Sequence, residues 1–382
     1  MALIAAERVV TGDTGPQPRP LTLTVADGRI TEVRDGVDPR AEFVDGWIVP
    51  GFVDTHCHGA AGADLAGADS DGVAAAIGHH RRHGTTTLFA STVTESMDDV
   101  ITQIGRLRPL VESGELAGIH LEGPFLSEAK KGAHNPALLI DPAPEHVEAI
   151  LWASGGSVRS VTLAPERTHG IDATRRFTDA GVAVAFGHSD ADDTLTRGCL
   201  DAGAAVVTHL FNAMRPIHHR DPGPIPLLLD DPRPMVELIC DGTHLHPDVI
   251  AMAIDAAGIH RVALVTDAMS ATGQSDGDYG LGSLRVAVRG GVAKILQADG
   301  TLGAIAGSTL TMAAAVAYVV GHVGREVGEA AIMAATTPAR RFGLDQVGQL
   351  APGRRADLCV LYDDGVLQKV MRHGVRVEGS GS

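Results

Sequence analysis

Histidine and carboxylate side chains recur at the ends of short apolar runs in this sequence. The run IVPGFVDTH (48–56) ends at Asp54 and His56, and His58 follows two residues later. Residues two apart on a strand share a face, so both histidines can point into one cavity. Later runs end in residues of the same kind, namely His120 and Glu122, His188, His209, Asp241 and His244, and Asp267. Imidazole nitrogens and carboxylate oxygens are typical donors for a divalent transition metal.

The combination of these groups indicates a metal centre more strongly than any one of them. A single histidine at a strand end is usually a hydrogen-bonded core residue. Imidazoles and carboxylates that converge from several strands would be costly in a poorly solvated site unless a cation held them together. Donors without thiolate suit Zn²⁺, Fe²⁺, Mn²⁺ or Co²⁺, and an incomplete shell leaves room for a water molecule. We expect a catalytic site with one or two ions per chain, zinc being the first choice.

The polar run ends can meet only if the strands that carry them lie side by side. Eight apolar runs alternate with helix-length stretches, which predicts right-handed βα units and a closed, TIM-like (β/α)8 barrel. In such a barrel the C-terminal strand ends share one face. An open doubly wound sheet is the alternative, but the first strand lacks a glycine-rich phosphate motif. The runs are IVPGFVDTH, TTTLFASTV, LAGIHLEG, VRSVTLAPE, VAVAFGHS, AAVVTHLFN, MVELICDGTH and RVALVTDA, and helices are expected at 71–83, 97–113, 170–181, 192–202, 247–257 and 308–323.

Both ends of the chain are typical of short strands joined by tight turns. The N-terminal end contains LTLTVA before an Asp27-Gly28 turn, and the C-terminal end contains ADLCVLYDD and a His373-Gly374 turn. We expect residues 1–47 and 346–382 to pair into a small β-sandwich domain beside a barrel of residues 48–345. The segments 213–230 and 275–303 exceed ordinary βα loops and are expected as insertions near the active-site mouth.

Charge and cysteine content restrict the partners and the compartment. The formal net charge is −16, from 31 Lys and Arg against 47 Asp and Glu, so we expect no nucleic-acid partner. The four cysteines lack CxxC spacing, which indicates reduced thiols and a cytoplasmic protein. The start, MALIAAERVV, lacks a basic segment before an apolar run, and no later stretch offers about 18 uncharged apolar residues. We therefore expect neither export nor a membrane partner.

Nine motifs occur in a fixed order over nearly the whole chain. They are PGFVDTHCHG (50–59), HLEGPF (120–125), KKGAHNP (130–136), GHSDA (187–191), THLFNAM (208–214), DGTHLHP (241–247), VTDAM (265–269), AGSTLTM (306–312) and GRRADLCVL (353–361). In this order they resemble the N-acetylglucosamine-6-phosphate deacetylase family of the amidohydrolase superfamily. HLEGPF followed closely by KKGAHNP, together with THLFNAM, is specific to that family.

The resemblance implies an activity and a set of site residues. The activity is removal of the N-acetyl group from N-acetyl-D-glucosamine 6-phosphate, giving D-glucosamine 6-phosphate and acetate, in amino-sugar catabolism and cell-wall recycling. The family's metal ligands fall on Glu122, His188 and His209, and its catalytic acid/base falls on Asp267. His56 and His58 match superfamily members that hold a second metal. Implied substrate contacts are Ala133, His134, Asn212, Ala213, Arg220, Asp241, Gly242, Thr243, His244, Ile305, Ala306 and Gly307.

These residues would supply what the hydrolysis of an acetamide needs. Asp267 would accept a proton from the attacking water and pass it to the departing amine, while His134 orients the sugar or supports the carbonyl. Arg220 would bind the phosphate through two parallel hydrogen bonds, helped by His244. Because the Arg220 loop projects from the barrel, Arg220 can serve the active site of a second subunit, and we expect a homodimer.

Three other functions stay open at this point. A dihydroorotase-like cyclic amidase commonly carries a carboxylated lysine at the end of the fourth run, where this chain has Glu166. A nucleobase deaminase commonly lacks a glutamate at the position of Glu122. A binding scaffold that kept the barrel would not need the ligands, Asp267 and the substrate loop together.

Overall fold

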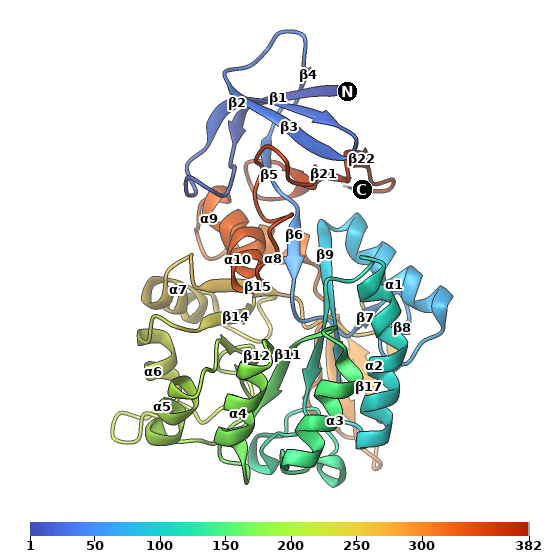
Figure 1. Cartoon of the computed structure of the whole chain (residues 1–382), viewed down its shortest axis with the longest axis vertical. Helices are drawn as coiled ribbons and strands as arrows, with labels where there is room; N and C mark the ends of the chain where they lie inside the picture. Colours follow the sequence, from blue (N-terminus) through green and yellow to red (C-terminus); the bar gives the residue numbers. More distant parts are fainter. Residues whose placement is uncertain (381–382) are drawn as a thin grey trace.

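The molecule consists of a barrel of parallel strands and a smaller sheet that contains both ends of the chain (Figure 1). The structure is a computed structural model that describes residues 1–380. The small sheet lies at one end of the molecule, and both termini lie beside it at the top of the view in Figure 1. The catalytic residues predicted from the sequence all belong to the barrel or to its loops.

The barrel strands occur in space in the order in which they occur along the chain. They are β6 (Phe52–Asp54), β9 (Thr85–Thr92), β10 (Gly118–Glu122), β11 (Val158–Leu163), β12 (Ala183–Phe186), β13 (Val206–Val207), β14 (Met235–Ile239) and β15 (Val262–Val265). Neighbouring strands pair in parallel. The first and last strands meet just beyond their ends, where the N–H of Asp267 donates to the carbonyl of His56 at 2.8 Å. Each predicted run contains one of these strands, so the predicted barrel is confirmed.

The barrel strands form a rigid frame because they are buried on both faces. β9, β10, β14 and β15 are buried at each of their positions. Strands covered on both faces are typically continuous apolar runs without alternation, as in β15 (VALV), whereas β9 (TTTLFAST) buries five hydroxyl side chains. Phe52, Phe89 and Phe186 are completely buried within or beside them. Burial of one such side chain contributes about 1.5–3 kcal/mol to folding, which holds the strand ends in place.

Helices cover the outside of the barrel. Six of them lie where the sequence predicts: α1 (Ser70–Arg82), α2 (Met97–Glu112), α4 (Gly170–Asp179), α5 (Asp193–Asp201), α7 (Pro247–Ala257) and α8 (Met312–Gly321). Helix α1 shows why. The Asp69 side chain accepts a hydrogen bond from the N–H of Gly72, a cap that contributes about 1 kcal/mol. Val73, Ala76, Ile77 and His80, at helical spacing, are the residues that it buries.

Two further helices flank the barrel without having been predicted. Helix α3 (Pro144–Ser154) begins with proline at its first position, which is a start signal that the sequence offered. Helix α6 (Ile225–Asp230) is six residues long and lies inside the segment 213–230. Its shortness leaves almost no helical periodicity to detect. After α8 the chain passes through α9 (Val327–Ala331), the π-helical turn η3 (Ile332–Thr336) and α10 (Thr337–Arg341) to the small sheet.

The expected insertion at 275–303 forms a sheet of its own. Its four antiparallel strands are β16 (Gly277–Leu281), β17 (Leu284–Arg289), β18 (Val292–Leu296) and β19 (Leu302–Ile305). Gly290 and Gly291 join β17 to β18 with φ angles of 59° and 77°, values that suit a tight hairpin turn. Leu281 and Val286 pack with Val93 in a separate apolar cluster. The insertion is therefore a packed wall beside the barrel mouth.

The two ends of the chain pair as predicted, and hydrogen bonds join them into one eight-stranded sheet. Its strands are β1 (Ala2–Val9), β2 (Arg19–Ala26), β3 (Arg29–Asp35), β4 (Glu42–Phe43), β5 (Trp47–Pro50), β20 (Leu358–Leu361), β21 (Leu367–Arg372) and β22 (Val375–Arg376). We propose that the chain divides as its sequence indicates, into 1–47 with 346–382 and 48–345, with β5 crossing between the two units. Among residues 1–380, no helix is long and apolar enough to cross a membrane.

Candidate active site

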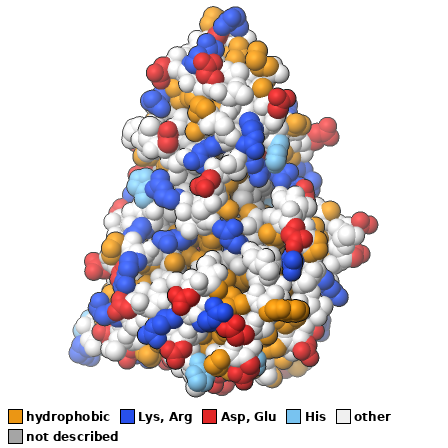
Figure 2. Space-filling view, viewed as in Figure 1, with side chains coloured by type: hydrophobic (Ala, Val, Ile, Leu, Met, Phe, Trp, Pro, Cys, Tyr) orange, Lys and Arg blue, Asp and Glu red, His pale blue; other side chains and the backbone are white. Residues whose placement is uncertain are grey.

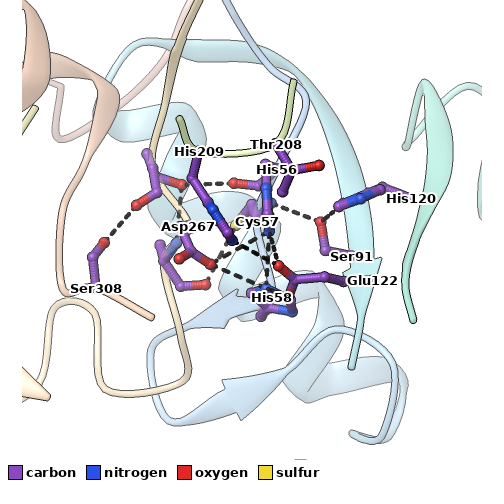
Figure 3. Close-up of polar contacts among 12 residues, drawn as sticks. His56, Cys57, His58, Ser91, His120, Glu122, Thr208, His209, Asp267 and Ser308 are labelled. Atoms are coloured by element: carbon purple, nitrogen blue, oxygen red, sulfur yellow. Dashed lines mark hydrogen bonds and ion pairs between the residues drawn. The ribbon is translucent and has the colours of Figure 1, made fainter. Parts of the chain in front are cut away.

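Six side chains that the sequence singled out converge at the C-terminal end of the barrel. We call them the ligand cluster: His56, His58, Glu122, His188, His209 and Asp267. Figure 3 shows five of them pointing toward one another, all but His188. Glu122 is the last residue of β10, and the others lie in the loops just after strands β6, β12, β13 and β15.

Three members of the cluster have backbone conformations that are rare for residues other than glycine. His188, His209 and Asp267 have φ angles of 47°, 24° and 49°. Left-handed backbone at such residues costs on the order of 1–3 kcal/mol each and persists where the surroundings enforce it. Each of the three follows a short strand by two residues, so the chain turns sharply and aims the side chain inward.

The first half of the cluster consists of Glu122, His188 and His209. Oε1 of Glu122 lies 3.1 Å from Nε2 of His188 and 3.0 Å from Nε2 of His209. The two Nε2 atoms are themselves 3.1 Å apart. Three donor atoms within such short distances of one another match the arrangement that a single cation requires.

The second half of the cluster consists of His56, His58 and Asp267, and Glu122 also reaches it. Oε2 of Glu122 lies 3.3 Å from Nε2 of His58, which in turn is 3.1 Å from Oδ1 of Asp267. Nε2 of His56 is 3.3 Å from Nε2 of His58 and 3.4 Å from Oδ1 of Asp267. Oε2 of Glu122 therefore faces the second half, whereas Oε1 contacts both halves, since it also lies 3.5 Å from Nε2 of His56.

The electrostatics of the cluster favour cations. Burial acts to raise the pKa of Glu122, but His56 and hydrogen bonds from His134, His188 and His209 bring that pKa well below its usual value. Burial likewise acts on Asp267, yet His56 and His58 lower its pKa to about 2. Burial lowers the pKa of His58, and Asp267 and Glu122 more than reverse this, raising it to about 9. Two buried anionic carboxylates thus draw positive charge into the cluster, and this donor set fits a divalent metal.

Two other residues at the strand ends support the cluster from inside the barrel. His120 does not join it, because its ring is 2.9 Å from Ser91 Oγ and 2.7 Å from Thr162 Oγ1. Asp54 accepts a hydrogen bond of 2.6 Å from the hydroxyl of Thr266, and burial raises its pKa to about 7. Asp54 therefore holds β6 against the segment that follows β15.

The cluster opens into a cavity of about 410 Å³. Most of the substrate contacts implied by the sequence line it, namely Ala133, His134, Asn212, Ala213, His244, Ile305 and Gly307. Asp241 lies behind the wall and holds His244, with its Oδ2 atom 2.7 Å from Nδ1. Burial lowers the pKa of His244, but Asp241 raises it above its ordinary value, so His244 presents a proton donor to the cavity. Gly242, Thr243 and Ala306 belong to the same loops without lining the cavity.

His134 faces the cluster as a neutral hydrogen-bond donor. The backbone N–H of Thr94 donates to its Nδ1 atom at 3.3 Å, which leaves the proton on Nε2. Nε2 lies 3.5 Å from Oε2 of Glu122. Burial lowers the pKa of His134 to about 4, so the ring is neutral at pH 7.

Arg220 lies away from the cavity of its own chain. Its guanidinium is exposed and contacts Nε2 of His219 at 2.7 Å, and Arg220 is absent from the cavity lining. Of the residues that line this cavity, Lys130 alone carries a permanent positive charge. Asp190 contacts both Lys130 Nζ and Arg215 at 3.4 Å, and Arg215 also contacts Asp221 at 3.5 Å, so two carboxylates face two cations. Lys130 is thus the cation at the cavity wall, and it shares its partner Asp190 with Arg215.

The structure adds two residues that the sequence analysis had not singled out as site residues. Lys130 lies within the motif KKGAHNP, so a signal was present. Glu237 is a buried carboxylate in the middle of β14. The only signal for it in the sequence was a charged residue within an apolar run. Glu166, at the end of the fourth run, accepts hydrogen bonds from Ser189 Oγ at 2.7 Å and Asp190 N at 2.6 Å. It thus supports the loop after His188 and does not enter the cluster as a bridging lysine would.

Comparisons with known proteins agree with this geometry. The profile of the amidohydrolase family matches residues 47–377. N-acetylglucosamine-6-phosphate deacetylase of Vibrio furnissii is 35% identical over 332 residues, or 86% of this chain and 82% of that protein. N-acetylgalactosamine-6-phosphate deacetylase of Escherichia coli O157:H7 is 35% identical over 92% of this chain and 93% of its own.

Solved structures give the same result. That of N-acetyl-D-glucosamine-6-phosphate deacetylase from Mycobacterium smegmatis superposes with a TM-score of 0.93 at 43% identity, over 99% of this chain and 100% of that chain. The corresponding enzyme from Thermotoga maritima has a TM-score of 0.88 at 30% identity, over 98% and 99% of the two chains. The chain therefore belongs to the amidohydrolase family, among its members named N-acetylglucosamine-6-phosphate deacetylase.

Proposed function

We propose that this protein hydrolyses the N-acetyl group of N-acetyl-D-glucosamine 6-phosphate to give D-glucosamine 6-phosphate and acetate. The observation that carries this proposal is the position of Asp267. Its carboxylate belongs to the ligand cluster and also lines the cavity beside His134. The relatives named for this reaction support the choice of substrate. The reaction would serve the breakdown of amino sugars and the recycling of cell-wall material.

The proposed cofactor is a divalent transition metal, zinc in the first place, with Fe²⁺, Mn²⁺ or Co²⁺ as alternatives. Glu122, His188 and His209 would hold one ion, and His56, His58 and Asp267 would hold a second, with Glu122 between them. When bound, such a metal lowers the pKa of water and polarises the acetamide carbonyl.

Asp267 is proposed to move the proton. Its lowered pKa indicates that the carboxylate is anionic, which is the form that a general base must have, and Asp267 lines the cavity where the attacking water would give up its proton. The C–N bond of the amide then breaks, and the protonated Asp267 returns the proton to the departing amine. The acetyl carbon leaves as acetate, and the carboxylate of Asp267 is restored.

His134 is proposed to hold the carbonyl that is attacked. Its Nε2–H points toward the cluster and its ring is neutral, so it can donate a hydrogen bond to the oxygen on which negative charge develops. Asn212 and the backbone of the loop around Ala133 line the same cavity and can fix the sugar ring.

The 6-phosphate needs local cations because the chain has a net charge of −16. Figure 2 shows acidic and basic side chains interspersed over one face of the molecule, which offers no uniform attraction there. We propose that Lys130 and His244 of one subunit and Arg220 of a second copy bind the phosphate together. This arrangement requires a homodimer, which we also propose, in the cytoplasm.

The C4 epimer is a second candidate substrate. The relative from Escherichia coli O157:H7 named for N-acetylgalactosamine 6-phosphate is as similar to this chain as the relative from Vibrio furnissii. The two sugars differ only in the direction of one hydroxyl, a change that a few contacts in the cavity can distinguish or tolerate.

Acetate release is the test of this proposal. The protein purified without chelator is assayed with both 6-phosphates and with unphosphorylated N-acetylglucosamine. We expect rapid release from the gluco epimer, loss of activity after chelation, and recovery when Zn²⁺ is added back. A metal-loaded protein that releases acetate from neither phosphate would refute the proposal, and faster turnover of the galacto epimer would reassign the substrate.

A further inference from the structure

Glu237 is a buried carboxylate that the proposed reaction does not use. It lies in the middle of β14 and is 4% exposed. Both of its strand neighbours, Val236 and Leu238, are fully buried in the apolar core. A carboxylate in such surroundings is costly unless specific partners bind it, so its contacts indicate what it does.

The two oxygens of Glu237 contact the segment that carries the first histidine pair. Oε1 accepts a hydrogen bond of 3.0 Å from the hydroxyl of Thr55, and Oε2 lies 3.3 Å from Nδ1 of His56. β14 and β6 are not neighbours in the barrel sheet, so the side chain of Glu237 reaches across the barrel interior to make these contacts.

This contact determines which nitrogen of His56 is available to the cluster. A carboxylate accepts only, so Nδ1 of His56 must donate its proton to Glu237. In a neutral imidazole, Nε2 then carries a free lone pair. Nε2 lies 3.3 Å from Nε2 of His58 and 3.4 Å from Oδ1 of Asp267, and therefore faces the second half of the cluster.

Glu237 also connects the second half of the cluster to the first. Its backbone carbonyl accepts a hydrogen bond of 2.9 Å from the N–H of Leu210, the residue after His209. His188, in the first half, directs its Nδ1 toward the backbone carbonyl of Lys130 at 2.9 Å. His56 thus has a carboxylate where His188 has a neutral carbonyl, and a carboxylate partner makes an imidazole the stronger metal donor.

We propose that Glu237 is the positioning residue of the second metal site, which fixes His56 with Nε2 toward the ion and strengthens it as a ligand. This inference rests on the proposed metal-dependent function. Occupancy of the second site then depends on the triad Glu237–His56–metal, while the first site contacts only the backbone carbonyl of Glu237 and does not depend on its side chain. A chain with this fold that lacked a carboxylate at this position would bind the second ion weakly.

Three variants of the full-length protein separate orientation, charge and packing. Glu237→Leu removes both the acceptor and the charge. Glu237→Gln keeps an amide oxygen for the Nδ1 proton of His56 but lacks the charge, and the Thr55 hydroxyl can turn to accept from its NH₂ group. Thr55→Val is the matched control, because it removes the other hydrogen bond of Glu237 and leaves the contact with His56 intact.

The measurement is zinc bound per chain over a series of buffered free Zn²⁺ concentrations. We expect two ions in the wild type, about 10- to 100-fold weaker binding of the second ion in Glu237→Leu, and a smaller loss in Glu237→Gln. Thr55→Val should bind both ions nearly as the wild type does. Binding of the first ion should be the same in all four proteins, a result that a general loss of stability would not produce.

A double-mutant cycle with His56→Ala completes the test. Once the imidazole is gone, Glu237→Leu should weaken the second ion no further, because Glu237 acts through that ring. Three results would overturn the inference. Glu237→Leu could weaken the second ion equally with and without His56, or folded Glu237→Leu or Glu237→Gln could bind the second ion with unchanged affinity. The third is a wild type that binds one ion only. A wild type that binds two ions as described yet releases no acetate would instead refute the proposed function and leave this inference standing.

Discussion

Oδ1 of Asp267 lies 3.1 Å from Nε2 of His58. The proposed proton carrier is therefore held by a residue of the second half of the ligand cluster, at the floor of the cavity. This contact keeps the carboxylate anionic and directed toward the space where the acetamide must lie. Replacement of Asp267 should therefore affect mainly proton transfer, whereas replacement of His58 should affect mainly metal content.

Asp267→Asn should abolish deacetylation while substrate still binds. The amide keeps the shape of the side chain but cannot accept a proton from water at neutral pH, so we expect a loss in kcat of more than about 10²-fold. Binding of the substrate, measured by calorimetry, should change little because the sugar contacts remain. Activity within a few-fold of the wild type would show that another group carries the proton.

His56→Ala and His58→Ala should each lower the metal content from about two ions per chain to about one. Each removes a donor of the second half of the cluster and leaves Glu122, His188 and His209 unchanged. Elemental analysis of protein purified without chelator measures the change. His188→Ala is the comparison, since it should disturb the first site. An unchanged metal content in both His56→Ala and His58→Ala would mean that these histidines only support the first site.

Acidification should destabilise the protein in part through His80. Burial lowers the pKa of this fully buried histidine to about 4, against 6.5 for its ordinary value. Below pH 6.5 His80 is protonated in the unfolded chain, but in the folded chain it becomes protonated only near pH 4. The free energy of unfolding therefore falls as the pH drops from about 6.5 to about 4. The contribution is at most roughly 3 kcal/mol.

Urea unfolding of metal-free protein between pH 4.5 and 7.5 measures this effect, with His80→Gln as the comparison. The glutamine cannot titrate, so its unfolding free energy should depend less steeply on pH than that of the wild type. Parallel profiles would show that His80 takes up its proton equally in the folded and unfolded states.

The barrel could be predicted from the sequence because each strand is a local apolar run that ends at a polar residue. An apolar run that ends at His56, Glu122 or Asp267 is visible without any structure. Convergence followed from topology, since all C-terminal strand ends of a parallel barrel share one face. The left-handed backbone of His188 and His209 left no comparable mark, because residue type rarely reveals positive φ outside glycine.

What the sequence did not reveal depends on contacts between distant segments. Glu237 and His56 are separated by 181 positions, and nothing local to either residue indicates that they meet. The sheet β16–β19 was expected only as a long insertion, although its Gly290-Gly291 turn was readable. The role proposed for Arg220 depends on contacts with a second chain, which the fold of a single chain does not show.

Arg220→Gln should weaken the reaction of the phosphorylated sugar selectively. Loss of a charge-assisted phosphate contact should cost about 2–4 kcal/mol in kcat/KM for the 6-phosphate and barely change the slow hydrolysis of unphosphorylated N-acetylglucosamine. Lys130→Gln should show the same selectivity if the ammonium group of Lys130 also binds the phosphate. An equal loss on both substrates would show that the residue supports its loop and does not bind the phosphate.

Mixed dimers should reveal whose cavity Arg220 serves. The Arg220 side chain is exposed and absent from the cavity lining of its own chain. In a dimer of one Arg220→Gln chain and one Asp267→Asn chain, the first chain keeps Asp267 and can receive Arg220 from the second. If Arg220 acts across the interface, this one active site is complete and activity returns, although each parent homodimer is impaired. If Arg220 acts within its own chain, both sites of the mixed dimer lack one group and activity stays low. Co-purification of the two variants with different affinity tags, followed by acetate release from the 6-phosphate, measures the outcome.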